Sequence, residues 1–139
     1  MANTVRDVMS GDPVCLAPQT TLTEAAERMA ERDIGDVLIV DDSGLCGIVT
    51  DRDIVVRALA RHLDPEQATI GEICSGELVT VEVDDSIEQA VDLMRQRALR
   101  RLPVVSGGEP VGVVSIGDLA ESRDPTSALA DISTAMPNR

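Results

Sequence analysis

The chain has 139 residues and a net charge of −13, and it contains no Phe, Tyr or Trp. The negative charge argues against nucleic acid as a partner, because phosphates require a positive surface, and base stacking requires aromatic side chains that this chain lacks. No apolar run approaches the roughly 20 residues of a membrane span, and the first residues lack a signal-peptide core, so we expect a cytoplasmic protein with no membrane partner.

An internal repeat organises the sequence. When the chain is displaced by 65 residues, residues 5–55 align with 70–120 without a gap, and ten positions are identical. The identical pairs include Val14 with Val79, Ala25 with Ala90, Met29 with Met94, Gly47 with Gly112 and Asp53 with Asp118. A repeat of this length predicts two copies of one supersecondary unit.

The first copy predicts a short strand at 14–16, followed by a helix that begins with the capping box Thr21-x-x-Glu24. The inward stripe of this helix is predicted to contain Leu22, Ala25, Ala26 and Met29. Two strands follow at 37–40 and 46–50, joined by a turn at 41–44, and a second helix runs from Arg52 to about Leu63.

The second copy predicts the same elements. They are a strand at 79–81, a helix capped by Ser86-x-x-Gln89 with the stripe Ile87, Ala90, Val91 and Met94, strands at 102–105 and 111–115, and a helix at about 117–122. The remaining tail is polar, and a short helix near 127–132 and a frayed end are both compatible with it.

These elements predict an α/β (α+β) fold of two tandem β-α-β-β-α repeats packed with pseudo-twofold symmetry. The repeats span 5–63 and 70–122, a linker spans 64–69, and the polar C-terminal tail spans 123–139. A single copy of about 50 residues buries little surface, so we expect the two copies to pack together as one domain.

The end of each hairpin carries the residues best suited to bind a ligand. Gly47-Ile-Val-Thr50-x-x-Asp53 and Gly112-Val-Val-Ser115-x-x-Asp118 share a glycine, a hydroxyl and a carboxylate where a strand enters a helix. The hydroxyl and carboxylate can cap the helix, or they can hold a ribose diol or a phosphate at its positive end. These interpretations are compatible, because a cap hydroxyl can be shared.

This duplicated unit, with its two Gly-h-h-[Thr/Ser]-x-x-Asp motifs, resembles the cystathionine β-synthase (CBS) domain pair, or Bateman module, over about residues 5–120. The resemblance implies a cleft between the repeats with up to two adenosine-type sites. Ribose would be held by Thr50 with Asp53 and by Ser115 with Asp118. The implied apolar walls are Val14, Cys15, Ile34, Val37 and Leu38 in one copy and Val79, Thr80, Leu99, Leu102 and Pro103 in the other.

The resemblance also implies basic residues that meet phosphate before the second strand. Arg100 and Arg101 occupy that place in the second copy, whereas Gly35 and Asp36 occupy it in the first. A phosphate is therefore expected in the second copy, because Asp36 would repel it. An exposed arginine pair bridging to nearby carboxylates is the alternative. AMP, ADP, ATP, S-adenosylmethionine and NAD-like ligands all stay open, and none is an obligatory cofactor.

No catalytic or metal-binding pattern accompanies these motifs. Cys15, Cys46 and Cys74 lack the paired spacing of a zinc site, and His62 is the sole histidine. We therefore expect a regulatory sensor that is not an enzyme, reduced thiols or one disulfide, and a homodimer, for which Ile54, Val55, Ala58 and Leu59 could supply the face. The alternative is a ligand-free stress or interaction protein that acts as a dimer through an unidentified protein partner.

Overall fold

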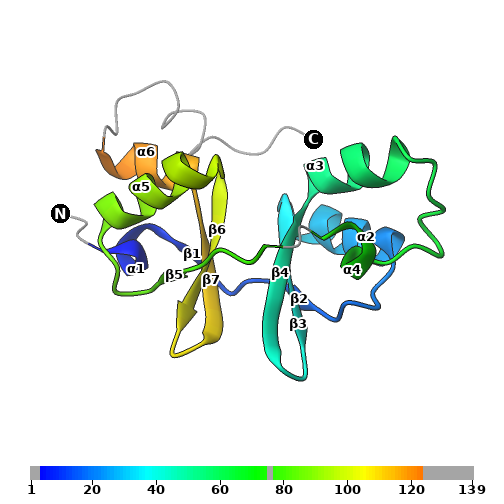
Figure 1. Cartoon of the computed structure of the whole chain (residues 1–139), viewed down its shortest axis with the longest axis horizontal. Coiled ribbons are helices and arrows are strands. Elements are labelled where there is room, and N and C mark those ends of the chain that lie inside the picture. The colour runs from blue at the N-terminus through cyan, green and yellow to red at the C-terminus, as the bar shows by residue number, and fades with distance from the viewer. Residues whose placement is uncertain (1–3, 75–76, 124–139) are drawn as a thin grey trace. The chain divides into compact units, whose positions relative to one another are not determined.

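The computed structural model describes residues 4–74 and 77–123, which form two compact units. Residues 13–74 and 77–78 make up one, named here the β3–β4 unit, and residues 4–12 and 79–123 make up the other, the β6–β7 unit. Each unit contains helices and one sheet (Figure 1). This confirms the predicted α/β (α+β) class.

In the β3–β4 unit the strand order is β2-β3-β4, with β2 parallel and β4 antiparallel to β3. Its core joins the buried face of the first long helix to alternate residues of the central strand. The elements are β2 (Cys15–Leu16), α2 (Leu22–Arg32), β3 (Asp36–Asp41), β4 (Gly44–Thr50), α3 (Asp51–Asp53), the π-helix η1 (Ile54–Leu59) and α4 (Ile70–Ile73).

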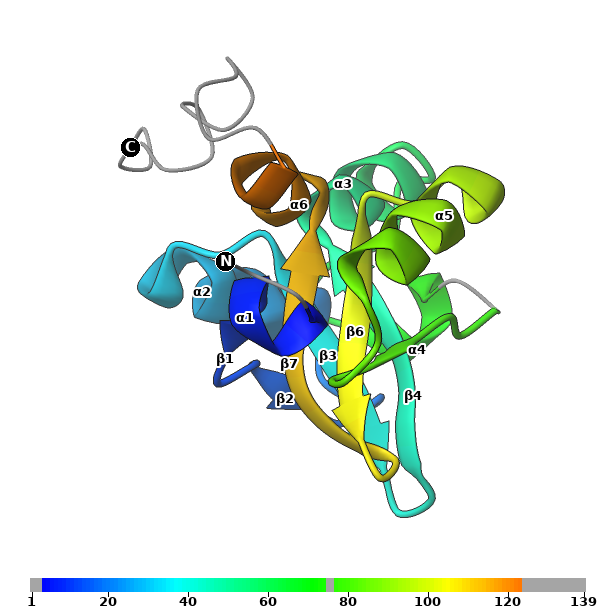
Figure 2. The same cartoon turned by 90° about the vertical axis from the view of Figure 1, so that its left-hand side faces the viewer.

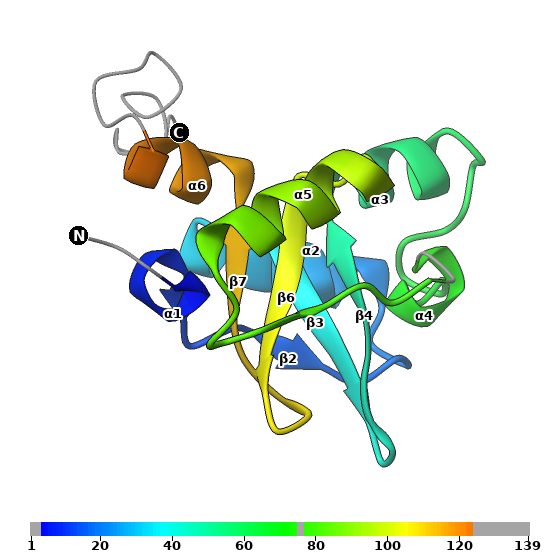
Figure 3. The ribbon, with the colours of Figure 1, turned by 60° about the vertical axis from the view of Figure 1, so that its left-hand side comes forward.

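In the β6–β7 unit the strand order is β1-β7-β6-β5. The elements are α1 (Val5–Val8), β1 (Ser10–Gly11), β5 (Val81–Glu82), α5 (Ile87–Arg97), β6 (Arg101–Ser106), β7 (Glu109–Ser115) and α6 (Ile116–Arg123). Figures 2 and 3 show α6 continuing from the end of β7, with α5 beside it. This junction holds the second predicted motif.

The compact units do not coincide with the linear repeats. The short helix that begins each repeat, α1 in the first and α4 in the second, packs in the core of the unit formed by the other repeat. Val5 of α1 is fully buried in the core with Val81 and Leu102, and its N–H donates to the Asp85 carbonyl at 2.9 Å. Ile70 is likewise fully buried in the core of the β3–β4 unit, and its N–H donates to the Thr20 carbonyl at 2.9 Å.

The predicted N-caps Thr21 and Ser86 are confirmed, but of the two only Ser86 closes the full capping box, because the Glu24 carboxylate accepts from the Thr21 hydroxyl. The Thr21 Oγ1 atom accepts the Glu24 N–H at 3.2 Å. Ser86 and Gln89 form the reciprocal box, in which the Ser86 Oγ atom accepts the Gln89 N–H at 3.1 Å and the Gln89 Oε1 atom accepts the Ser86 N–H at 2.7 Å. Both stripes are buried as predicted except for Ala26, which is exposed, and Val91, which is partly buried.

Two element boundaries differ from prediction. The second helix of the first copy begins at Asp51, changes to a π-helix at Ile54 and ends at Leu59, four residues early. There the Ala60 and Leu63 N–H groups donate to the Val55 and Ala58 carbonyls, and His62 takes a positive φ of 60°. In addition, β5 begins at Val81 and not at Val79.

The four hairpin strands begin one or two residues before their predicted ranges, and β3 and β6 also end one residue later, whereas β2 begins one residue late, at Cys15. Both hairpins carry a β-bulge at the same place, after Ile39 and after Val104. The predicted helix near 127–132 lies outside the described residues. Within those residues, no helix is long and apolar enough to cross a membrane.

Candidate functional site

The Thr50–Asp53 pair closes a reciprocal cap at the start of α3. The Thr50 Oγ1 atom accepts the Asp53 N–H at 3.1 Å, and the Asp53 Oδ2 atom accepts the Thr50 N–H at 2.9 Å. The Asp53 Oδ1 atom lies 3.6 Å from Nε of Arg57, one helical turn later. Both carboxylate oxygens of Asp53 therefore already have partners within the unit.

The Ser115–Asp118 pair repeats this cap at the start of α6. The Ser115 Oγ atom accepts the Asp118 N–H at 3.1 Å, and the Asp118 Oδ2 atom accepts the Ser115 N–H at 2.8 Å. Ser122 stands where Arg57 stands in the first copy, and no cation of residues 4–74 and 77–123 forms an ion pair with Asp118. The capping interpretation holds for both motifs.

The two carboxylates therefore differ electrostatically. Burial raises the pKa of Asp118, and the hydrogen bonds from Ser115 only partly offset this effect. Among the described residues, no buried side-chain oxygen or nitrogen lacks a partner. Because no described group donates to the Asp118 Oδ1 atom, that atom keeps access to solvent and can accept a hydroxyl hydrogen.

The residue across the hairpin from the cap is basic in one copy and acidic in the other. In the β6–β7 ladder Arg101 pairs with Ser115, and the Ile116 N–H donates to the Arg100 carbonyl at 2.9 Å. In the β3–β4 ladder Asp36 pairs with Thr50, and the Asp51 N–H donates to the Gly35 carbonyl at 2.9 Å. The structure thus brings both predicted arginines to the Ser115 cap and an acidic residue to the Thr50 cap.

Arg100 and Arg101 are not equally placed. Arg100 is exposed, and within the described residues it forms no ion pair. Arg101 is half-buried and takes part in other interactions within the structure. Arg100 is therefore the cation that can turn toward an anion without losing an ion pair.

Close packing within each unit leaves no room for a side chain at the motif glycines Gly47 and Gly112. A Cβ on Gly112 would lie 2.5 Å from the Ser10 carbonyl oxygen and 2.8 Å from the Met9 sulfur. A Cβ on Gly47 would collide with the sulfur of Cys74, which is the repeat equivalent of Met9. These close contacts at the motif glycines are made by the exchanged segments of the opposite repeat.

Most of the implied apolar walls belong to the cores. Val14, Val37 and Leu102 are core residues with at most 6 % exposure. Pro103 and Leu38 are also buried, whereas Val79, Thr80, Ile34 and Leu99 are half-buried and Cys15 is exposed. Only the latter group has side-chain surface to offer to a ligand.

Sequence reasoning missed Arg57. Its guanidinium contacts Asp53 and donates through Nη1 to the Ile73 carbonyl at 3.3 Å, which ties the π-helix to α4. Its i,i+4 spacing from Asp53 on the predicted helix was the available signal. No sequence signal pointed to the hydrogen bond with the Ile73 carbonyl of α4, because residues 70–73 were assigned to the other repeat.

The three cysteines are the other reactive side chains that the sequence offers. All three thiols are free. Burial raises the pKa of Cys15 and Cys74, and a hydrogen bond to Asp41 raises that of Cys46, so neutral thiols are favoured. Among residues 4–74 and 77–123, no cluster of three or more His, Cys, Asp or Glu side chains is placed to hold a metal ion.

Two similar α/β units, each with a hydroxyl–carboxylate cap at a strand–helix junction, define a tandem-repeat module. The family model of the CBS domain matches residues 5–59 and again 70–124. The chain belongs to the CBS domain family and contains two copies of the domain, as its sequence motifs predicted.

Curated relatives share this architecture over most of their length. Hypoxic response protein 1 of Mycobacterium tuberculosis is 42 % identical over 118 residues, which cover 84 % of this chain and 82 % of that protein. The CBS domain-containing protein YhcV of Bacillus subtilis is 37 % identical over 135 residues, covering 94 % and 96 %.

Solved structures agree with the fold. Hypoxic Response Protein I, crystallised with two coordinated zinc ions, superposes with a TM-score of 0.76 at 41 % identity, covering 85 % of this chain and 97 % of that one. The CBS domain pair of protein MJ0100, in complex with 5′-methylthioadenosine and S-adenosyl-L-methionine, gives 0.80 at 26 % identity, covering 91 % and 100 %.

Proposed function

We propose that this protein is a non-catalytic sensor that binds an adenosine-containing ligand at the Ser115–Asp118 cap. The observation that carries the proposal is the grouping of a solvent-accessible carboxylate oxygen, a hydroxyl and two arginines around the first turn of α6. A ribose diol can donate to Asp118, and a phosphate can meet Arg100 and the positive end of the helix.

The charge difference between the two copies supports a preference for phosphate at this cap. The Thr50 cap has Asp36 across the ladder and Asp51 at the helix start, and its Asp53 is engaged by Arg57. A phosphate there would meet like charge. The Thr50–Asp53 site therefore suits a less anionic adenosine derivative, or stays empty.

The relatives support the ligand class but not its identity. The CBS pair of MJ0100 binds 5′-methylthioadenosine and S-adenosyl-L-methionine. The ligand in this chain is proposed from AMP, ADP, ATP, S-adenosylmethionine and NAD-like molecules. We propose none of these as an obligatory cofactor.

Titration calorimetry with these five ligands tests the proposal, since the chain has no Trp or Tyr to report binding by fluorescence. We expect at least one phosphate-bearing ligand to bind wild-type protein. The Asp118→Asn variant keeps an oxygen for the Ser115 N–H but loses the charge, and should bind at least tenfold more weakly, whereas Asp53→Asn should bind as wild type. No heat with any ligand, or equal losses in both variants, would contradict the proposal.

A second function is favoured by apolar surface on η1. Val55, Val56 and Leu59 are 56 %, 47 % and 56 % exposed on this one short helix. Exposed apolar patches commonly mark contacts with other proteins, so we propose a homodimer or a protein partner at η1. Sedimentation should show a dimer that Leu59→Arg dissociates; an unchanged monomer in both proteins would exclude the homodimer.

A further inference from the structure

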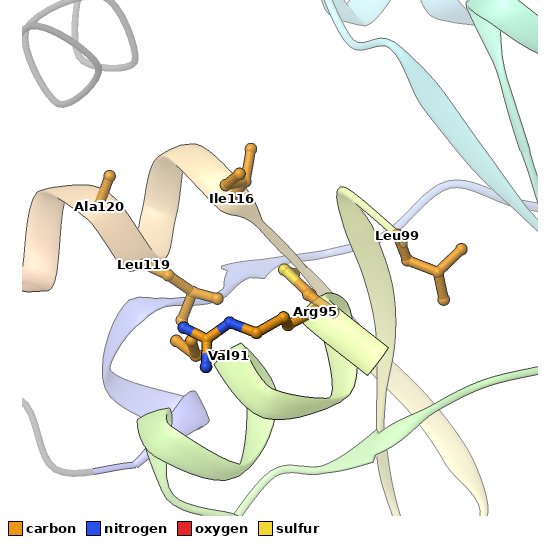
Figure 4. A pocket seen from close by; sticks show the side chains of 7 residues that line it. Val91, Arg95, Leu99, Ile116, Leu119 and Ala120 are labelled. Carbon is orange, nitrogen blue, oxygen red and sulfur yellow. The ribbon is translucent and has the colours of Figure 1, made fainter. Parts of the chain in front are cut away.

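A hollow of about 320 Å³ lies between α5 and α6 of the β6–β7 unit (Figure 4). Apolar side chains form most of its wall, namely Val91, Met94, Leu99, Ile116, Leu119 and Ala120. No hydroxyl or carboxylate lines it, although Leu99 also belongs to the implied adenosine wall and Ile116 lies within the Ser115–Asp118 motif, so the hollow adjoins the proposed nucleotide site.

Arg95 is the one charged residue of the wall, and Figure 4 shows its guanidinium beside Leu119 and Val91. Its Nη1 atom lies 3.6 Å from an Asp92 carboxylate oxygen, and both side chains are largely exposed, at 75 % and 62 %. Exposed i,i+3 pairs contribute little to stability. Arg95 can therefore exchange Asp92 for an anion held in the hollow at small cost.

We propose that this hollow binds a monomeric alkyl carboxylate of about eight to ten carbons. Since one water occupies about 30 Å³ of liquid, the volume corresponds to about ten heavy atoms. The alkyl chain would bury against the apolar wall, and the carboxylate would meet the guanidinium fork of Arg95, a pairing that suits arginine better than lysine.

The first repeat lacks this combination. Arg95 corresponds to Ala30, and Ile116 corresponds to Asp51, so the equivalent wall has no cation and gains an acid. The site is therefore specific to the second repeat, in a chain whose net charge of −13 otherwise disfavours anions.

Octanoate is the probe, and the methyl resonances of Ile116, Leu119 and Val91 report its position by NMR. We expect these methyls to shift on titration and to show contacts with the octanoate chain. Arg95→Gln should weaken octanoate binding about tenfold, whereas Arg97→Gln, which removes the same charge from α5 outside the hollow, should not. Ala120→Leu should abolish binding by filling the hollow, and 1-octanol should bind wild type about as weakly as octanoate binds Arg95→Gln.

Three outcomes would overturn the proposal. The first is equal binding of octanoate and 1-octanol, which would mean that Arg95 takes no part. The second is methyl shifts confined to other residues. The third is intermolecular contacts from a second copy to Ile116 and Leu119 that octanoate does not displace, which would assign the hollow to self-association. Val91 and Arg95 belong to neither the Ser115–Asp118 motif nor the implied adenosine wall, so the Val91 shift and the Arg95→Gln loss test the hollow alone, and their failure leaves the proposed nucleotide site intact.

Discussion

Asp118 caps a helix and is also the carboxylate proposed to bind ribose. The cost of its negative charge to the stability of the fold depends on pH. Burial raises its pKa in the folded protein, so the folded state binds a proton more readily than the unfolded state does. Its ionisation therefore costs stability as pH rises from the ordinary carboxyl value of 3.8 through the raised one, and below 3.8 this cost is absent.

Asp118→Asn should reveal this cost. Asparagine can still accept the Ser115 N–H, but it carries no charge to desolvate. We expect the unfolding free energy of the variant minus that of wild type, measured by urea denaturation, to be larger at pH 7 than at pH 3.5. The variant should therefore gain stability relative to wild type as pH rises. A difference that does not change with pH would mean that Asp118 is not desolvated.

Gly47 is predicted to tolerate no side chain while Cys74 is present. Gly47→Ala should lower the unfolding free energy by about 1–3 kcal/mol, because its Cβ meets the Cys74 sulfur. Cys74→Ala in the same chain should recover part of the loss by removing that sulfur. Gly11→Ala is the matched control, since no atom lies within 4 Å of its Cβ position. A loss that Cys74→Ala leaves unchanged would contradict the steric account.

At the scale of the element, the exchanged first helices predict long-range effects of local substitutions. Val5→Ala should cost about 2 kcal/mol, although Val5 lies 76 residues before Val81 in the chain, because both share one core. Leu78→Ala, at a 40 % exposed position outside the proposed η1 contact, should cost less than about 0.5 kcal/mol. Urea denaturation of both variants checks this, and equal small losses would mean that α1 is not part of the β6–β7 core.

Helix caps offer a second test at this scale. Ser86→Ala removes the acceptor of the Gln89 N–H and should lower the unfolding free energy by about 1 kcal/mol. Ser86→Asp keeps an acceptor at the helix start and should restore most of it. A neutral Ser86→Ala would indicate that the cap contributes nothing beyond its solvated alternative.

Local signals explain which elements were predicted. Capping residues and apolar periodicity placed α2, α5 and both hairpins, because these features act within a few residues of each other. The exchange of α1 and α4 was not predicted, since it depends on contacts such as Val5 with Val81 that no local pattern encodes. The change to a π-helix at Ile54 was also missed, and so was the nonlocal hydrogen bond from Arg57 to the Ile73 carbonyl.

The sequence pointed to the residues of the candidate site, but it did not show which of them cap a helix and which are available to a ligand. The repeated motif identified Ser115 and Asp118, and position identified Arg100 and Arg101. Sequence alone left both capping and ligand binding open at these positions. The structure resolves the capping geometry, and it adds the absence of a described cation at Asp118 that distinguishes this cap from the one at Asp53.

For the whole molecule, the two copies have the same folded plan but different charge. The β6–β7 unit carries arginines at its cap and an arginine at its hollow, whereas the equivalent positions in the other copy are Gly35, Asp36 and Ala30. Duplication thus supplies one scaffold twice, and the arginines substituted into one copy are the basis for proposing that this copy binds anions.

Amide chemical shifts during an AMP titration test this central claim most directly, because they locate binding residue by residue. The account predicts the largest shifts at Ser115–Asp118 and at Arg100–Leu102, with smaller shifts at Thr50–Asp53. Shifts that are largest at Thr50–Asp53, or absent from the Ser115 cap at saturating AMP, would contradict it.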